Sequence, residues 1–401
     1  MRIAFITPEY ITEPNFDGGL ANYLYRVSVA LKDFEHEPLI IVGTNRDDVI
    51  VHGGIQVNRV DVTLPGRAIL QHIPYVRRLI PAIQWIWQSW RLNRRLSELQ
   101  NQQRIDVAQF ASYTGTALFR SKEIPSVVRI SSMQSLWESA NAVTNTLTRK
   151  LQIFIEYFAL GKADHLFGPS RLIAEAVANK TGHPVTVIES PFLMSEMRWD
   201  CQLYHDILAG KDYLLFFGTL SRLKGAHVIA AILPDLLSRH PSIYFVFAGK
   251  DAGYNGNPMM NHLWEKAGKS RGRIIHLGVL PHDQLYPVIQ NARSIVLPSL
   301  IDNLPNSCIE SMSLGQIVIG TQGASFEQLI DDGSSGFLCT QNDPASLLDK
   351  IDRALNLDLS QRNEITKNAK ARIAQLAPDL TVKTLIDFYL EIKETARKHC
   401  Q

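Results

Sequence analysis

Cysteine is scarce in this chain, and the few cysteines share no short spacing. Only Cys201, Cys308, Cys339 and Cys400 occur among 401 residues. Zinc sites and disulfide frameworks need cysteines at short, paired spacings, so the sequence predicts neither kind of site. We therefore expect a protein of a reducing compartment.

Long apolar runs are also missing. No segment approaches the roughly 20 apolar residues that a membrane-spanning helix needs. The first apolar segment, residues 3–7, soon meets Glu9, so it is too short for a signal peptide and is typical of a first strand. We expect a cytoplasmic protein.

A strong charge of either sign is absent as well. The formal net charge is +2, which argues against a nucleic-acid partner. Hydrophobic residues make up 45% of the chain and charged residues 20%, which excludes wholesale disorder. Neither half carries a Gly-x-Gly-x-x-Gly fingerprint after its first strand, so the usual dinucleotide-binding interpretation loses its main support.

What the chain does contain is a repeated alternation of strand-like and helix-like segments, which favours parallel sheets. The expected strands cover residues 3–7, 39–43, 57–60, 107–110, 126–130 and 165–168, and then 213–217, 243–248, 274–277, 294–297 and 317–320. We predict an α/β protein with two Rossmann-like domains, residues 1–195 and 196–379. Residues 380–401 contain a helix with one apolar face, which we expect to return to the first domain.

Two carboxylates flank the loop after the expected strand 294–297. Asp302 would lie at the mouth of this strand, and Glu310 would lie within a helix that begins near Ser307. Open α/β sheets bind their ligands at the carboxyl ends of the strands. The two acids could therefore hold the hydroxyl groups of a sugar.

Two cations precede a second expected helix. Arg222 and Lys224 follow the strand 213–217, and the helix begins at about residue 226. Cations are disfavoured at a helix amino terminus, so the pair needs a compensating anion, either a protein carboxylate or a ligand such as a diphosphate. Ordinary solvated cations are the alternative. The paired glycines Gly18 and Gly19 could let backbone approach a ligand, or they could form an ordinary turn.

With these segments, the chain resembles a retaining glycosyltransferase of the GT-B fold, family 4, also called glycosyl transferases group 1. The segments 18–19, 218–225, 302–315, 323–333 and 336–338 occur in the order that is typical of the family. The resemblance implies two domains that face a central cleft, with a sugar nucleotide bound mostly by the second domain. It also implies transfer without a metal or another cofactor, with retention of anomeric configuration and no protein nucleophile.

The resemblance assigns a role to each matching residue. Arg222 and Lys224 would neutralise the diphosphate, Glu310 would bind the ribose, and Asp302 would face the donor sugar, where the family usually has glutamate. Backbone near the donor would come from Gly18, Gly19, Gly218, Asn303, Leu304 and Asn306, and backbone near the base from Val279 and Leu280. Glu327 matches an acid common in the family, and we expect a structural role for it first.

A departure from the family pattern lies in the first domain. Ser131 stands where the family often has a histidine near the transferred sugar. Serine does not titrate near neutrality, so a proton would have to move through another group, such as a donor phosphate oxygen. Arg129, on the acceptor side, could contact a phosphate or pair with an acid.

Residues 67–104 form a basic stretch that contains Trp85, Trp87, Trp90 and a single acid, Glu98. Such a helical stretch could make peripheral contact with a membrane, or its tryptophans could pack in the core.

The leading hypothesis for function is transfer of a sugar from a UDP-, GDP- or ADP-sugar to a glycan or lipid-linked saccharide. This activity would belong to polysaccharide or glycolipid biosynthesis and would take place in the cytoplasm, at the inner face of the membrane if the basic stretch binds there. A nucleotide-sugar epimerase of the same fold and a noncatalytic sugar-nucleotide or glycan-binding protein are the alternatives.

Overall fold

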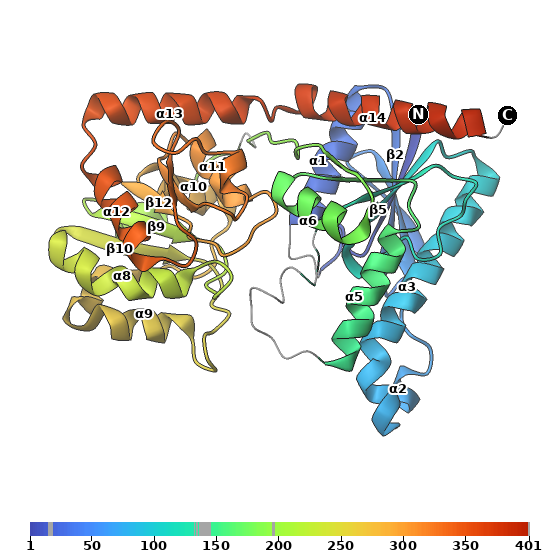
Figure 1. The fold of residues 1–401 in the computed structure, drawn as a ribbon, viewed down its shortest axis with the longest axis horizontal. Helices are drawn as coiled ribbons and strands as arrows, with labels where there is room; N and C mark the ends of the chain where they lie inside the picture. Colours follow the sequence, from blue (N-terminus) through green and yellow to red (C-terminus); the bar gives the residue numbers. More distant parts are fainter. Residues whose placement is uncertain (15–18, 132, 134, 136–145, 195–196, 400–401) are drawn as a thin grey trace. The chain divides into compact units, whose positions relative to one another are not determined.

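The structure is a computed structural model that describes residues 1–14, 19–131, 133, 135, 146–194 and 197–399. The chain divides into two compact units (Figure 1). Unit 1 consists of Met1–Pro191 and Ala377–Gln401, and unit 2 consists of Phe192–Leu376. The change of unit therefore falls a few residues before the expected boundary near residue 196, and the return falls just before the expected helix 380–401.

Unit 1 is built on a sheet whose described strands have the order β3-β4-β2-β1-β5-β6-β7-β8. All neighbours are parallel except β3, which pairs with β4 in the antiparallel direction. The strands are β1 (Arg2–Thr7), β2 (Glu37–Thr44), β3 (Asp48–His52), β4 (Ile55–Asp61), β5 (Val107–Ala111), β6 (Ser126–Arg129), β7 (His165–Gly168) and β8 (Val185–Val187).

The described helices of unit 1 include the carboxyl-terminal helix, α14. They are α1 (Gly19–Asp33), α2 (Arg67–Leu70), α3 (Pro74–Gln102), η1 (Tyr113–Gly115), α5 (Leu147–Leu160), α6 (Arg171–Thr181) and α14 (Pro378–His399). On α14, Val382, Leu385, Ile386 and Tyr389 are buried in one core cluster with β1 and α1. The apolar face expected for residues 380–401 therefore packs on the first domain.

Unit 2 is built on a fully parallel sheet with the order β11-β10-β9-β12-β13-β14. The strands are β9 (Asp212–Phe217), β10 (Ile243–Ala248), β11 (Ile274–His276), β12 (Ser294–Val296), β13 (Val318–Thr321) and β14 (Phe337–Cys339). The helices are α7 (Gln202–Ile207), α8 (Ala226–Arg239), α9 (Met259–Ala267), η2 (Gly268–Arg273), α10 (His282–Gln290), α11 (Asn306–Ser313), η3 (Phe326–Gln328), α12 (Pro344–Leu355) and α13 (Leu359–Ala374).

The strand order of unit 2 reverses at β9. This strand pairs with β10 on one side and with β12 on the other. The chain runs outward from β9 through β10 to β11, and it then returns to the other side of β9 and continues outward through β12, β13 and β14. In open α/β sheets, such a switch point leaves a crevice at the carboxyl ends of the strands. The loops after β9 and β12 therefore form the expected position of a ligand site.

The two ends of unit 2 meet at one hydrogen bond. The backbone N–H of Phe192 donates to the carbonyl of Leu376, with an N to O distance of 2.8 Å. The chain therefore enters unit 2 and leaves it at the same point.

Candidate functional site

The loops after β9 and β12 are joined by an ion pair. Lys224 Nζ lies 2.5 Å from Asp302 Oδ2. The Asp302 side chain is 12% exposed and the Lys224 side chain 32%, so the pair is partly shielded from water. The sequence predicted a compensating anion beside Arg222 and Lys224. In the structure, Asp302 is the anion that pairs with Lys224.

Gly225 allows these two loops to touch. Its φ is +75°, and a Cβ added there would lie 1.8 Å from the carbonyl oxygen of Pro298. A side chain at this position is therefore excluded both by the backbone conformation and by space. Next to this contact, Leu300 N–H donates to Leu223 O over 2.7 Å.

Helix α8 begins at Gly225 with no hydrogen bond from a capping side chain. The first N–H groups of a helix carry a partial positive charge and need acceptors. Arg222 is exposed beside this helix start, and among the described residues no carboxylate forms an ion pair with it. Among the described residues, Arg222 therefore adds a positive charge without an ion-pair partner at the start of α8, where the N–H groups of Ala226 and Val228 already donate to Ser221 O and Gly225 O.

Two further glycines bring the ends of β9 and β10 together. Gly218 has a φ of +123°, and its N–H donates to Ala248 O over 2.9 Å. At Gly249, with φ +143°, an added Cβ would lie 1.9 Å from Gly218 O. The two strand ends therefore touch at Gly249, whereas a Cβ added at Gly218 would meet nothing within 4 Å, so the space beside Gly218 is open.

Asp302 is held in place by the backbone and by a residue that the sequence did not single out. Its Oδ1 accepts the N–H of Asn303 over 3.1 Å, and its carbonyl accepts the Ser325 hydroxyl over 3.0 Å. Ser325 is 1% exposed and has a φ of +67°, an uncommon conformation for serine. The sequence carries no signal for this conformation. Leu304 anchors the same loop in the core of unit 2.

Glu310 lies in α11, as the sequence predicted, and is 8% exposed. Its Oε1 lies 3.7 Å from Nε2 of His282, the first residue of α10. The sequence analysis missed His282, because nothing local connects it with Glu310. Asn306 is exposed at the first position of α11, and its preceding residue, Pro305, provides no side-chain cap.

The expected base-adjacent residues lie at the same edge of the sheet. Val279 is 71% exposed and Leu280 is half-buried, in the loop after β11. This loop is tied to the loop after β10, because Gly249 N–H donates to Gly278 O over 2.6 Å. The strand order places it two strands away from β9. Glu327 is exposed and accepts the Gly323 N–H over 3.2 Å, which is a local structural role.

Under this edge, Cys308 of α11 is completely buried. Burial, together with the charge of Asp302, raises the pKa of the Cys308 thiol well above its ordinary value. A thiol with a raised pKa is a poor nucleophile at neutral pH. Cys308 is therefore a packing residue and not a second reactive group.

Arg129, on the acceptor side of unit 1, is held by an aromatic ring and a hydroxyl. It is 5% exposed, stacks over the Tyr23 ring at 3.6 Å from its centroid, and donates to Ser190 Oγ over 2.9 Å. Among the described residues it forms no ion pair, so both expectations for it, a phosphate contact and a pairing with an acid, stay predictions. Burial lowers the pKa of Arg129.

Ser131 is half-buried, and its backbone N–H donates to Ser112 Oγ over 3.1 Å. Of the two predicted glycines, Gly19 is the exposed first residue of α1, and Gly18 lies outside the described residues.

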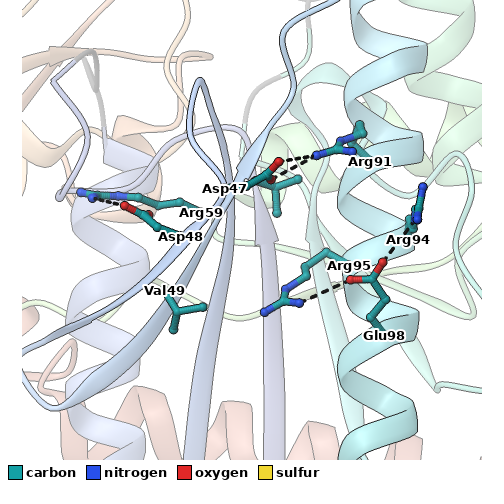
Figure 2. Close-up of a pocket in the computed structure, with 9 residues that line it drawn as sticks. Asp47, Asp48, Val49, Arg59, Arg91, Arg94, Arg95 and Glu98 are labelled. Atoms are coloured by element: carbon teal, nitrogen blue, oxygen red, sulfur yellow. Dashed lines mark hydrogen bonds and ion pairs between the residues drawn. The ribbon is translucent and has the colours of Figure 1, made fainter.

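The basic stretch 67–104 divides into a first part, residues 67–79, and a second part, residues 80–104. Figure 2 shows that, in the second part, Arg91 is paired with Asp47 and that Arg94 and Arg95 converge on Glu98. These arginines line a pocket of about 330 Å³ together with Asp48 of β3. The Trp87 Nε1–H donates to Thr63 O over 3.0 Å. Arg91, Arg94 and Arg95 are therefore paired with acids, one of which, Asp47, lies outside the stretch.

The described residues show neither a cluster of metal-binding side chains nor a helix that could span a membrane. They contain no group of three or more His, Cys, Asp or Glu side chains that could hold a metal ion. None of the described helices combines the length and the apolar character that crossing a bilayer requires.

Comparison with solved structures identifies the fold as GT-B, the two-domain fold of many glycosyltransferases. The chain is similar to sucrose-phosphate synthase from Thermosynechococcus elongatus, with a TM-score of 0.75, 15% identity and coverage of 98% of this chain and 99% of that chain. It is also similar to the Anabaena protein HepE, solved in complex with UDP and glucose, with a TM-score of 0.68, 16% identity and coverage of 98% and 99%.

Two family profiles match the chain and give the same answer. The family described as Glycosyl transferases group 1 matches residues 205–372, and the Glycosyl transferase 4-like domain matches residues 18–189. Together the two matches cover most of the chain, and they support its assignment to the group 1 glycosyl transferases.

The curated relatives match over less of their length. The D-inositol 3-phosphate glycosyltransferase of Corynebacterium jeikeium is 28% identical over 181 residues, which are 44% of this chain and 43% of that protein. The alignment thus spans less than half of that relative.

Proposed function

We propose that the protein transfers a sugar from a nucleotide-sugar donor to a glycan or lipid-linked saccharide, with retention of anomeric configuration, in polysaccharide or glycolipid biosynthesis. The observation that carries this proposal is the exposed Arg222 at the amino-terminal end of α8, beside the ion pair between Lys224 and Asp302. Arg222 and the dipole of α8 place positive charge where the leaving diphosphate would sit, and Lys224 would add to it on leaving Asp302. The family matches support the same reaction class.

The proposed chemistry relies on charge stabilisation. Lys224, Arg222 and the amino-terminal N–H groups of α8 would stabilise the charge that develops on the leaving diphosphate. Asp302 would accept a hydrogen bond from a hydroxyl of the donor sugar, and Glu310 would accept one or two from the ribose. The acceptor hydroxyl would attack from the face that the diphosphate leaves, and a diphosphate oxygen would take its proton, because Ser131 does not titrate near neutrality.

The donor nucleotide is proposed from a structural neighbour. HepE of Anabaena was solved with UDP and glucose, so UDP-sugars are the first donors to test, followed by GDP- and ADP-sugars. The acceptor is more open, because the relative that acts on D-inositol 3-phosphate aligns with less than half of this chain. A cytoplasmic location and contact with a membrane through part of residues 67–104 also remain proposals.

A thermal-shift screen over UDP-, GDP- and ADP-sugars tests donor binding, because a ligand that binds the folded state raises its melting temperature. The donor found is then used with Lys224→Ala and with Lys266→Ala, which removes an exposed lysine of α9. We expect Lys224→Ala to lower turnover about a hundredfold, by roughly 3 kcal/mol of transition-state stabilisation, and Lys266→Ala to leave it unchanged. Near-normal turnover in Lys224→Ala would refute the assignment.

The same donor separates the alternatives. An epimerase would change the donor sugar without any acceptor. A noncatalytic binding protein would bind the donor and never turn it over, whichever acceptor is supplied. Transfer with retention requires an acceptor and gives a product with the anomeric configuration of the donor, which NMR of the product reads directly.

A further inference from the structure

A basic and apolar surface lies at one end of unit 1. It consists of residues 66–79, which include α2 and the first turns of α3, and residues 147–150 at the start of α5. We call these residues the basic tip. Figure 1 shows α2 at the end of α3, with α5 beside α3. The Thr148 hydroxyl donates to the carbonyl of Arg78, which joins the two segments.

The apolar side chains of the basic tip are unusually exposed. Tyr75 is 84% exposed, Ile69 71%, Leu147 67% and Ile73 43%. Large apolar side chains that are exposed singly need no explanation, but a group of them on neighbouring elements marks an interaction site. Removing these side chains from water would contribute favourably to binding of any surface with an apolar interior.

All charged residues of the basic tip are cations. Arg67, Arg77, Arg78 and Lys150 are exposed, and residues 66–79 and 147–150 contain no Asp or Glu. This distinguishes the basic tip from the second part of α3, where Arg91, Arg94 and Arg95 are paired with acids (Figure 2). The positive charges of Arg67, Arg77, Arg78 and Lys150 are therefore available to an anionic partner.

We propose that the basic tip docks on the surface of a bilayer that contains anionic lipids. Tyr75, Ile69, Ile73 and Leu147 enter the interfacial region, and the neighbouring cations contact lipid phosphates, which is the combination that interfacial membrane segments use. A second copy of the same surface is a poor partner, because it would place cations against cations. Docking on a bilayer would bring the enzyme to a lipid-linked acceptor. Only this purpose, and not the docking itself, rests on the proposed function.

Vesicle co-sedimentation of the full chain tests the proposal, without donor or acceptor. The probes are phosphatidylcholine vesicles and vesicles of phosphatidylcholine with phosphatidylglycerol. The charge variant is Arg67→Gln/Arg77→Gln/Arg78→Gln, and its matched control is Lys266→Gln/Lys269→Gln/Lys367→Gln, which removes the same charge from exposed positions of unit 2. The apolar variant is Ile69→Ser/Tyr75→Ser, and its control is Val51→Ser, because Val51 is 71% exposed on β3.

We expect the wild-type protein to bind the anionic vesicles and to bind the neutral ones far less. Each cation near an anionic surface contributes roughly a fivefold change in partitioning, so the charge variant should bind about a hundredfold more weakly. The apolar variant should also lose binding, and both controls should match the wild type. Equal binding by the charge variant and its control would overturn the proposal, as would absence of binding to anionic vesicles.

A change of oligomeric state in the tip variants, measured by size-exclusion chromatography with unchanged vesicle binding, would identify the surface as a protein interface and overturn the proposal. Circular dichroism and the donor thermal shift serve as folding controls. Both tip variants should keep the donor response, because the donor-binding side chains proposed above, Arg222, Lys224, Asp302 and Glu310, lie in unit 2. A variant that loses vesicle binding but still binds the donor therefore tests the basic tip alone. A wild-type protein that shows no thermal shift with any donor would count against the proposed function alone.

Discussion

Lys224 Nζ and Asp302 Oδ2 are 2.5 Å apart, so the cation proposed for the diphosphate and the carboxylate proposed for the sugar neutralise each other. A diphosphate would compete with Asp302 for the same ammonium group. Once Lys224 turned to the diphosphate, the Asp302 carboxylate would be released toward the donor sugar. One ion pair would thereby couple recognition of the diphosphate to recognition of the donor sugar.

The substitution Asp302→Asn should separate these two tasks. Because Lys224 loses its competing carboxylate, we expect the affinity for a free nucleoside diphosphate to stay the same or to rise severalfold. Turnover should fall about a hundredfold, because an amide replaces the charged acceptor of a sugar hydroxyl. Calorimetric titration and initial rates measure the two quantities. A parallel loss of nucleoside diphosphate affinity would show that Asp302 instead supports the structure of the loop.

The substitution Glu310→Gln should raise the donor KM with little change in turnover. A buried carboxylate that accepts ribose hydroxyls contributes about 1.5–3 kcal/mol through charged hydrogen bonds, which corresponds to roughly ten- to a hundredfold in KM. Glu327→Gln is the control, since Glu327 is exposed and bonded to Gly323 N–H. If donor KM values of the two variants agree, Glu310 does not bind the ribose.

Substitutions of Arg129 should distinguish a packing role from a phosphate contact. Arg129→Ala removes the stacking on Tyr23 and opens a cavity, so we expect a loss of about 2 kcal/mol in the free energy of unfolding. Arg129→Met keeps the volume and removes a buried charge, so its stability should lie near the wild-type value. Denaturant unfolding measures both. If Arg129→Met is stable yet loses most of its turnover, Arg129 contacts the substrate.

The stability contribution of Asp251 should depend on pH. Burial raises the pKa of Asp251, but the N–H groups of Met260, Met259 and Gly253 outweigh this effect, and the pKa lies below its ordinary value. A lowered pKa means stability that is present above the pKa of the unfolded chain and is lost as the pH falls through the lower, folded value.

We therefore expect Asp251→Ala to destabilise the protein by about 1 kcal/mol near neutral pH, as the loss of a helix cap does. The difference from wild type should shrink below about pH 4, where the carboxylate becomes protonated. Urea unfolding of the wild type and of Asp251→Ala, near neutral pH and below about pH 4, measures this difference in the free energy of unfolding. A difference that is independent of pH would mean that packing, and not the charge, holds the start of α9.

Much of the fold followed from local pattern. The strands that are buried on both faces, such as β9 and β10, are continuous apolar runs, and they lie where the sequence predicted them. Three strands at or near the sheet edges were missed: β3, β8 and β14. They are short, and β3 and β8 are largely exposed, so their pairing depends on the neighbouring strand and not on their own hydrophobic pattern.

The individual residues of the candidate site could be named from the sequence, but the contacts between them could not. Lys224 and Asp302 are far apart in the chain, and only the reversal of strand order at β9 makes them neighbours. The acid that pairs with Arg91 is Asp47, which lies outside the basic stretch, so the sequence of the stretch, with Glu98 as its single acid, did not reveal this pairing. The roles of Ser325 and His282 also depend on such tertiary contacts.

The hydrogen bond between Phe192 and Leu376 has a consequence for how the chain can be cut. Unit 2 is an uninterrupted segment whose two ends adjoin, whereas unit 1 is assembled from both ends of the chain. Removing the last 25 residues would therefore leave unit 2 whole and strip Val382, Leu385 and Tyr389 from the core of the amino-terminal domain. A carboxyl-terminal truncation of this protein would therefore destabilise its first domain.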